Sequence, residues 1–200
     1  MLVKKERILA AALTVFYETG YDLATIDMVA EKAGMARRTI YGYFKNLEEI
    51  FYAVYLDGLQ KRVACMSETE FNALNGLERL RFFGERYLDF YLINPAYLKM
   101  QIYLEYRDDM KDNQNKDFMQ FHEANMQLSN LLLSTFELGI RDGSIRKDLN
   151  TFHFFHYYAI SLRSLANQVL AGNRSNNINP FFTREYYLNF LELFLQMIKA

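Results

Sequence analysis

With 200 residues, of which 51% are hydrophobic and 16% aromatic, the chain can bury a substantial core, which excludes an intrinsically disordered protein. The formal net charge of −1 means that any positive surface has to be local. A single cysteine excludes a disulfide framework, and no run of about 20 apolar residues suggests a membrane span.

The basic start MLVKKERILAAAL is interrupted by Glu6 and Arg7, which argues against a signal peptide. We therefore expect a cytoplasmic protein with no membrane partner. Beyond this start, helical periodicity dominates, and only two prolines and nine glycines interrupt it, so the sequence predicts an all-α fold. The predicted helices span 4–19, 26–33, 36–44, 47–67, 76–93, 95–107, 115–141, 151–171 and 183–198.

The second and third predicted helices are short, and Gly34 separates them, which is typical of a helix-turn-helix. Thr25 is placed to cap the first of this pair. On a helical wheel of the next helix, Ile40 and Phe44 share the side that would pack inward. The opposite side carries Arg37, Arg38, Tyr41, Gly42 and Lys45. Arginine can bind guanine bidentately and tyrosine can contact phosphate or a thymine methyl, so this side suits the DNA major groove.

Charge is concentrated on that helix. Residues 1–55 hold as many acidic as basic residues, whereas 32–47 hold four cations and no acid. This pattern fits a protein that inserts one helix into DNA. Inside the predicted helix, Gly42 would cost about 1 kcal/mol of helix propensity. We interpret it as a position where the backbone approaches DNA closely.

Residues 8–52, ILAAALTVFYETGYDLATIDMVAEKAGMARRTIYGYFKNLEEIFY, resemble the DNA-binding domain of the TetR/AcrR family of ligand-responsive transcriptional regulators. The matching elements are Phe16 to Gly20-Tyr21, Thr25, Val29-Ala30, Ala33-Gly34, Thr39-Ile40-Tyr41, Tyr43-Phe44 and Glu48-Glu49-Ile50. A weaker similarity at Gly139 and 143–149 resembles the turn before the family's dimerisation helices. The resemblance implies a three-helix helix-turn-helix domain at 1–46, joined to a helical bundle at 47–200 for ligand binding and dimerisation.

The resemblance also implies which residues bind DNA. They are Thr25, Arg37, Arg38, Thr39, Tyr41, Gly42, Tyr43 and Lys45. Thr25 would contact phosphate, the arginines and Thr39 would face bases, and the two tyrosines would hold the backbone. On the wheel Tyr43 lies nearer the packed side, so Tyr41 is the better supported of the two.

Three positions depart from the family pattern. Ala36 replaces a usual serine and removes a helix cap worth about 1 kcal/mol. Arg38 replaces a common glycine, and Leu47 replaces a common lysine that binds phosphate, a role that Lys45 would take over. These departures keep open the alternative of an interaction protein that has the fold but does not bind DNA.

Residues 71–126 are crowded with aromatic side chains and hold more tyrosines than a simple core prefers, because each buried hydroxyl needs a partner. The family resemblance implies a ligand cavity within this bundle. The predicted lining residues are Tyr87, Tyr91, Tyr103, Tyr106, Phe121, His122, Asn125 and Tyr157. Such a lining suits a small, mostly apolar or aromatic effector held by a few hydroxyl contacts.

The last two predicted helices are apolar nearly all round, so a second subunit is the expected cover, through a four-helix interface. In such a homodimer each recognition helix reads one half-site, about 34 Å from its mate. The sequence therefore predicts a repressor that binds a palindromic double-stranded DNA operator and is released by its effector. The helix at 47–67 would carry the coupling.

An enzyme or metal-binding protein is the alternative from another class, because His153 and His156 lie one helical turn apart. However, no glutamate precedes any histidine by three residues, as di-iron bundles require. HExxH, GxSxG, P-loop and GxGxxG motifs do not occur either. We therefore predict no catalytic residues, no metal and no cofactor.

Overall fold

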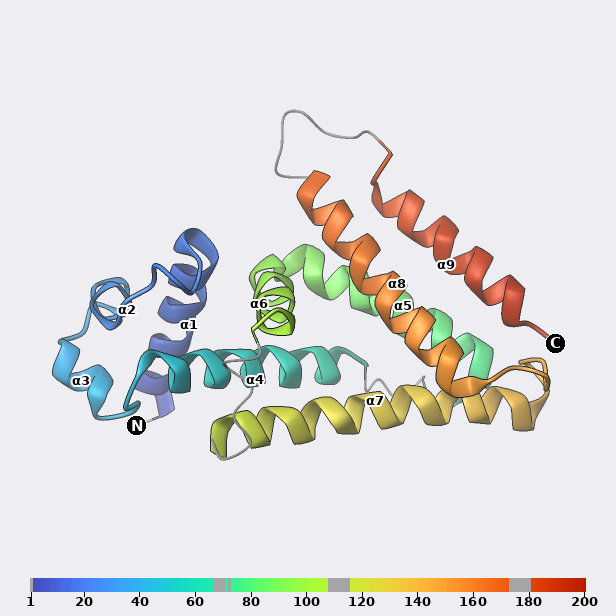
Figure 1. Cartoon of the computed structure of the whole chain (residues 1–200), viewed down its shortest axis with the longest axis horizontal. Helices are drawn as coiled ribbons and strands as arrows, with labels where there is room; N and C mark the ends of the chain where they lie inside the picture. Colours follow the sequence, from blue (N-terminus) through green and yellow to red (C-terminus); the bar gives the residue numbers. More distant parts are fainter. Residues whose placement is uncertain (1, 67–70, 72, 108–115, 173–180) are drawn as a thin grey trace. The chain divides into compact units, whose positions relative to one another are not determined.

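A computed structural model of the chain describes residues 2–66, 71, 73–107, 116–172 and 181–200 (Figure 1). All regular elements in these ranges are α-helices, which confirms the predicted fold class. The helices are α1 Leu2–Thr19, α2 Ile26–Ala33, α3 Arg37–Tyr41, α4 Leu47–Met66, α5 Gly76–Ile93, α6 Pro95–Glu105, α7 Lys116–Asp142, α8 Thr151–Gly172 and α9 Arg184–Ile198. Among the described helices none has the length and apolarity needed to cross a bilayer.

The chain packs as two units. The first comprises residues 1–60 and 96–125, and the second comprises 61–95 and 126–200. Two of the boundaries fall inside α4 and α7, so each of these helices supplies residues to both units, and the third follows the first residue of α6. The predicted boundary at residue 46 separates a DNA-binding part from a ligand-binding and dimerisation part. The packing of the chain into two units does not test this functional boundary, which stays a prediction.

In the first unit, α1, α2 and α3 surround a small apolar core. Ile8, Ala12, Val29 and Ile40 have no exposed surface. The Thr25 hydroxyl accepts a hydrogen bond from the Met28 amide at 3.2 Å, as predicted for the cap of α2. Gly34 ends α2 in the left-handed conformation, with φ of 61°, which turns the chain into α3.

In the second unit, α5, α8 and α9 pack against one another (Figure 1). Gly84 lies at their junction, where an added Cβ would stand 2.7 Å from a methyl carbon of Leu191. The Tyr158 hydroxyl donates to the Leu80 carbonyl oxygen, and the Tyr187 hydroxyl donates to that of Gly84 at 2.8 Å. Burial raises the pKa of both phenols, so they remain neutral donors that tie α8 and α9 to α5.

The start of α5 meets the end of α7. An added Cβ at Gly76 would lie 2.2 Å from the backbone nitrogen of Gly139, so only glycine fits there. The Gly76 amide donates to the Asp142 carboxylate at 2.7 Å, and the Leu77 amide donates to the Ser144 hydroxyl at 3.1 Å. Burial acts to raise the pKa of Asp142, but hydrogen bonds from Ser144 and Gly76 outweigh it and lower that pKa.

Candidate nucleic-acid interface

The predicted recognition helix is shorter than expected. It was predicted over 36–44, but α3 spans Arg37–Tyr41, and Gly42 lies at its C-terminal end with a right-handed φ of −71°. The interpretation of Gly42 as a glycine inside a helix is therefore wrong, and the helix-propensity penalty assigned to it does not apply. Its amide donates to the carbonyls of Arg38 and Thr39, both at 3.2 Å, as a tightening last turn does.

The start of α4 explains why α3 stops. Asn46 caps α4 by accepting from the Glu49 amide at 2.8 Å, and the Glu49 carboxylate accepts from the Lys45 amide at 2.7 Å. A helix cap requires non-helical backbone, so the chain has to leave α3 before Asn46. At the other end of α3, Ala36 makes no side-chain capping hydrogen bond, as the missing serine predicted.

Inward and outward residues separate on α3 and just after it as predicted. Ile40 is fully buried and Phe44 is 6% exposed. Arg37, Arg38 and Tyr41 are exposed, the tyrosine at 45%. The short helix thus presents two guanidinium groups and one phenol to solvent, while its apolar residues hold it to the rest of the unit.

Arg37 is held by neighbouring side chains. Its Nη1 donates to the Asp27 carboxylate at 2.9 Å and its Nη2 donates to the Tyr41 hydroxyl at 3.1 Å. The guanidinium carbon also lies 5.5 Å from the centre of the Tyr41 ring. The hydrogen bond to Tyr41, followed by attraction from Asp27, raises the pKa of Arg37, which keeps its charge. The sequence pattern did not reveal Asp27 as a partner, because it lies ten residues earlier on another helix.

The remaining predicted DNA-binding residues surround α3. Thr25 is exposed at the start of α2, and Thr39 and Tyr43 are half-buried. Lys45 lies after α3, not on it, with its side chain 89% exposed and its ammonium 3.6 Å from Glu49. Gly42 is exposed. The structure therefore brings the predicted set together on one unit, whereas contact with DNA stays a prediction.

A polar cluster fastens α6 to the loop between α1 and α2. The Tyr103 hydroxyl donates to the Asp22 carboxylate at 2.7 Å, and Arg107 forms an ion pair with the same carboxylate. Lys99 donates to the Tyr17 carbonyl at 2.8 Å. Burial and then the bond to Asp22 raise the pKa of Tyr103. Tyr103 was predicted to line a ligand cavity, but its hydroxyl is directed to this loop.

The other predicted ligand residues of the first unit do not converge. Phe121 is buried, with its ring centre 4.6 Å from that of Tyr55. Asn125 is half-buried, His122 is exposed, and Tyr106 is 83% exposed. Helical spacing placed Phe121, His122 and Asn125 correctly on a helix, whereas Tyr106 lies just after the end of α6. Spacing does not say which face of a helix another helix covers. His122 and Tyr106 are exposed, and their role in ligand binding stays a prediction.

In the second unit, Tyr87 and Tyr91 pack edge to face with ring centres 4.8 Å apart, around a buried arginine. Arg62 is only 5% exposed, donates to the Tyr91 hydroxyl at 2.6 Å, and lies 5.6 Å from the Tyr87 ring centre. Sequence reasoning missed Arg62, because nothing in the segment QKRVAC marks it as buried. Tyr157, in contrast, is 55% exposed on α8, and its role as a lining residue stays a prediction.

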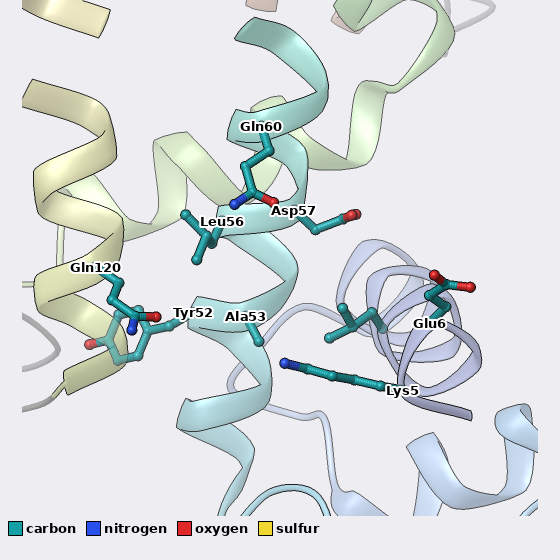
Figure 2. Close-up of a pocket in the computed structure, with 9 residues that line it drawn as sticks. Lys5, Glu6, Tyr52, Ala53, Leu56, Asp57, Gln60 and Gln120 are labelled. Carbon is teal, nitrogen blue, oxygen red and sulfur yellow. The ribbon is translucent and has the colours of Figure 1, made fainter. Parts of the chain in front are cut away.

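A pocket of about 270 Å³ opens beside α4 in the first unit (Figure 2). It is lined by Lys5, Glu6, Leu9, Tyr52, Ala53, Leu56, Asp57, Gln60 and Gln120. Figure 2 shows the Lys5 ammonium directed toward α4 near Ala53, whereas the Glu6 carboxylate is directed away. None of the eight predicted ligand residues lines this pocket.

The two histidines of the metal-binding alternative are engaged otherwise. A ring nitrogen of His156 lies 2.8 Å from the Phe152 carbonyl oxygen, and His153 is exposed. Within the described parts of the chain, no three histidine, cysteine or acidic side chains gather as metal ligands would. The histidine pair therefore gains no support as a metal site.

Comparison with known proteins adds a family. Residues 8–54 match the family described as bacterial regulatory proteins of the tetR family. The uncharacterized HTH-type transcriptional regulator YhgD of Bacillus subtilis is 42% identical over 52 residues, a match that spans 26% of this chain and 27% of YhgD. The fatty acid metabolism regulator protein of the same organism is 26% identical over 147 residues, which cover 74% of this chain and 73% of that protein.

The fold agrees with solved structures. The transcriptional regulator FadR from Bacillus subtilis, in complex with stearoyl-CoA, superposes with a TM-score of 0.74 at 17% identity, covering 98% of this chain and 97% of that chain. Both sequence relatives are named as regulators and not as enzymes, which removes the enzyme alternative. The helix-turn-helix with its outward arginines lies within the matched segment. Residues 8–54 therefore belong to the tetR family of bacterial regulatory proteins.

Proposed function

We propose that the protein is a transcriptional repressor that binds a palindromic DNA operator as a homodimer and is released by a small effector. The observation that carries the DNA-binding part is the exposed cationic side of α3. Arg37, Arg38 and Tyr41 face solvent, while Ile40 and Phe44 anchor the helix. Side chains of these types read base edges and phosphates in the major groove.

Exposed apolar side chains on α8 and α9 support the homodimer. On α9, Tyr186, Leu193 and Met197 are 44%, 70% and 52% exposed, and with half-buried Phe190 they recur at helical spacing along one stripe. On α8, Phe152, Tyr157 and Ile160 are all more than half exposed. Exposed apolar side chains that recur along one helix mark an association surface, and a two-fold interface would use the same stripe of α9 from both copies. Two recognition helices would then read half-sites about 34 Å apart.

The effector is proposed to be an apolar molecule that carries a negative charge. The Arg62 guanidinium, buried beside the rings of Tyr87 and Tyr91, supports this, because its planar set of donors matches a carboxylate or phosphate group. FadR, which shares the fold, was solved with stearoyl-CoA, a molecule that combines a long apolar chain with phosphates. Binding would release DNA only if the effector prefers the domain arrangement that does not fit the operator.

Selection from random duplex DNA tests the DNA-binding part. We expect a palindromic sequence to be enriched. The logarithm of its binding constant should fall linearly with the logarithm of the salt concentration. Arg37→Ala should reduce discrimination at one base pair per half-site by about tenfold or more. Arg141→Ala is the matched control, since it removes an equally exposed arginine from the end of α7. If no sequence is enriched and binding shows no salt dependence, the protein is an interaction protein with this fold and the proposal fails.

Titration of the operator complex tests the effector. Stearoyl-CoA, free stearate and an uncharged apolar ester of similar length would be compared for DNA release. We expect the anionic compounds to release DNA and the ester to have little effect. Arg62→Gln should weaken the anionic compounds selectively. Equal potency of all three compounds would contradict a role for charge.

A further inference from the structure

We infer that Asp27 is a specificity-determining residue, which holds the Arg37 guanidinium in the orientation that reads a base and lowers affinity for DNA in general. This inference rests on the proposed DNA binding and assigns a role to a residue that itself need not touch DNA. The carboxylate of Asp27 lies in the first turn of α2 and accepts from Arg37 Nη1 at 2.9 Å.

Two hydrogen bonds and a neighbouring aromatic ring restrain the Arg37 side chain. Asp27 and the Tyr41 hydroxyl each bind a different terminal nitrogen of the guanidinium, and the Tyr41 ring lies beside it. A guanidinium has five N–H donors, so these two bonds leave three for DNA, and a bidentate contact to guanine needs two. The two hydrogen bonds therefore fix the orientation of the guanidinium and leave enough N–H donors for a base contact.

Arg38, the next residue, is less restrained than Arg37. Arg38 is equally part of the outward side, yet its side chain makes no hydrogen bond or ion pair within the described residues. An arginine side chain without such restraints samples many rotamers until it binds, so it can reach phosphates in many positions. A restrained arginine presents its donors in one direction, which favours one base arrangement over others. The two neighbouring arginines are thus suited to different tasks.

Asp27 also carries a negative charge that affects binding to DNA of any sequence. Asp27 is exposed, with 63% of its side chain open to solvent, on the unit that would face the phosphates. A carboxylate there repels DNA of every sequence and also neutralises Arg37 in the unbound state. The repulsion lowers the affinity for every DNA sequence. At the operator, the base contact of the oriented Arg37 guanidinium offsets this loss of affinity, whereas at other sequences nothing offsets it, so Asp27 increases discrimination.

The test separates affinity from discrimination. Wild type, Asp27→Asn and Glu31→Gln would be titrated with the selected operator, with single-substituted operators and with random duplex. Glu31 is the matched control, because it is an exposed acid one turn further along the same face of α2 and its side chain makes no hydrogen bond or ion pair in the described residues. Both variants remove one negative charge.

We expect both variants to bind random duplex about two- to fivefold more tightly, with a steeper salt dependence. Only Asp27→Asn should lose discrimination, by about fivefold or more at one base pair of each half-site. Tyr41→Phe, which removes the second hydrogen bond and keeps the ring, should lose part of it, and Asp27→Glu should restore part. Thermal melting by circular dichroism checks that each variant is folded.

The inference is overturned if Asp27→Asn keeps wild-type discrimination at every position and merely matches Glu31→Gln in affinity. It is also overturned if Glu31→Gln relaxes discrimination as much as Asp27→Asn, because general charge would then explain the effect. A wild-type protein that binds selected and random duplex equally is a different result, since it removes the proposed DNA-binding function itself.

Discussion

Leu193 on α9 offers the most direct test of the proposed homodimer. The side chain is 70% exposed in the single chain and lies in the middle of the apolar stripe on α9. Leu193→Ala shortens it without adding a charge and leaves the buried residues of α9 in place. The variant should therefore fold normally and dimerise less tightly.

The magnitude follows from the exposed fraction. Complete burial of a leucine side chain is worth about 1.5–3 kcal/mol, and 70% of that is about 1–2 kcal/mol for each copy. A two-fold interface contains the residue twice, so the dimer should lose about 2–4 kcal/mol. That loss corresponds to a rise in the dissociation constant of about 30- to 800-fold.

Sedimentation velocity over a dilution series, without DNA, would measure this constant. Ile93→Ala is the control, because Ile93 is 79% exposed but lies at the end of α5, outside the stripe. It should leave the dimer unchanged. The reasoning is refuted if wild type is a monomer at micromolar concentration, or if Leu193→Ala and Ile93→Ala dimerise equally well.

Three further substitutions test the packing of the two units. Gly76→Ala forces a Cβ to 2.2 Å from the Gly139 nitrogen and should destabilise the second unit by about 3 kcal/mol, read as a fall in Tm of about 6–12 °C. Asp142→Asn should lower the free energy of unfolding by less than about 1 kcal/mol in denaturant titrations at neutral pH, because Asp142 is exposed and asparagine keeps an acceptor oxygen. Because the folded pKa of Asp142 is lowered, its contribution is complete above the usual aspartate pKa and disappears as the pH falls, so variant and wild type should converge below about pH 4. Asp22→Ala removes the acceptor of Tyr103 and should speed hydrogen exchange in the loop between α1 and α2, whereas unchanged exchange would show that the cluster does not hold it.

Local signals predicted the helices well. Thr25 caps the helix for which it was predicted, and Gly34 ends α2 in the conformation that glycine favours. The inward and outward sides of α3 also followed from spacing alone. These features depend on residues within about one helical turn, so the sequence carries them directly.

Features that depend on distant packing were not predictable. The end of α3 is set by the hydrogen bonds that start α4, a competition that periodicity cannot resolve, because Phe44 continues the apolar spacing. The pairing of Arg37 with Asp27 joins two helices across a turn. The burial of Arg62 and the exposure of Tyr106 depend on which helix covers which face.

The separation of inward and outward residues on and just after α3 has a consequence for the evolution of such a protein. Its anchoring residues, Ile40 and Phe44, point one way, and Arg37 and Arg38 point the other. Exchanging an outward residue removes no core contact, so under the proposed function new operator preferences would be accessible by single replacements that leave the unit's stability nearly intact. A lineage can therefore be redirected to other genes long before its architecture has to change.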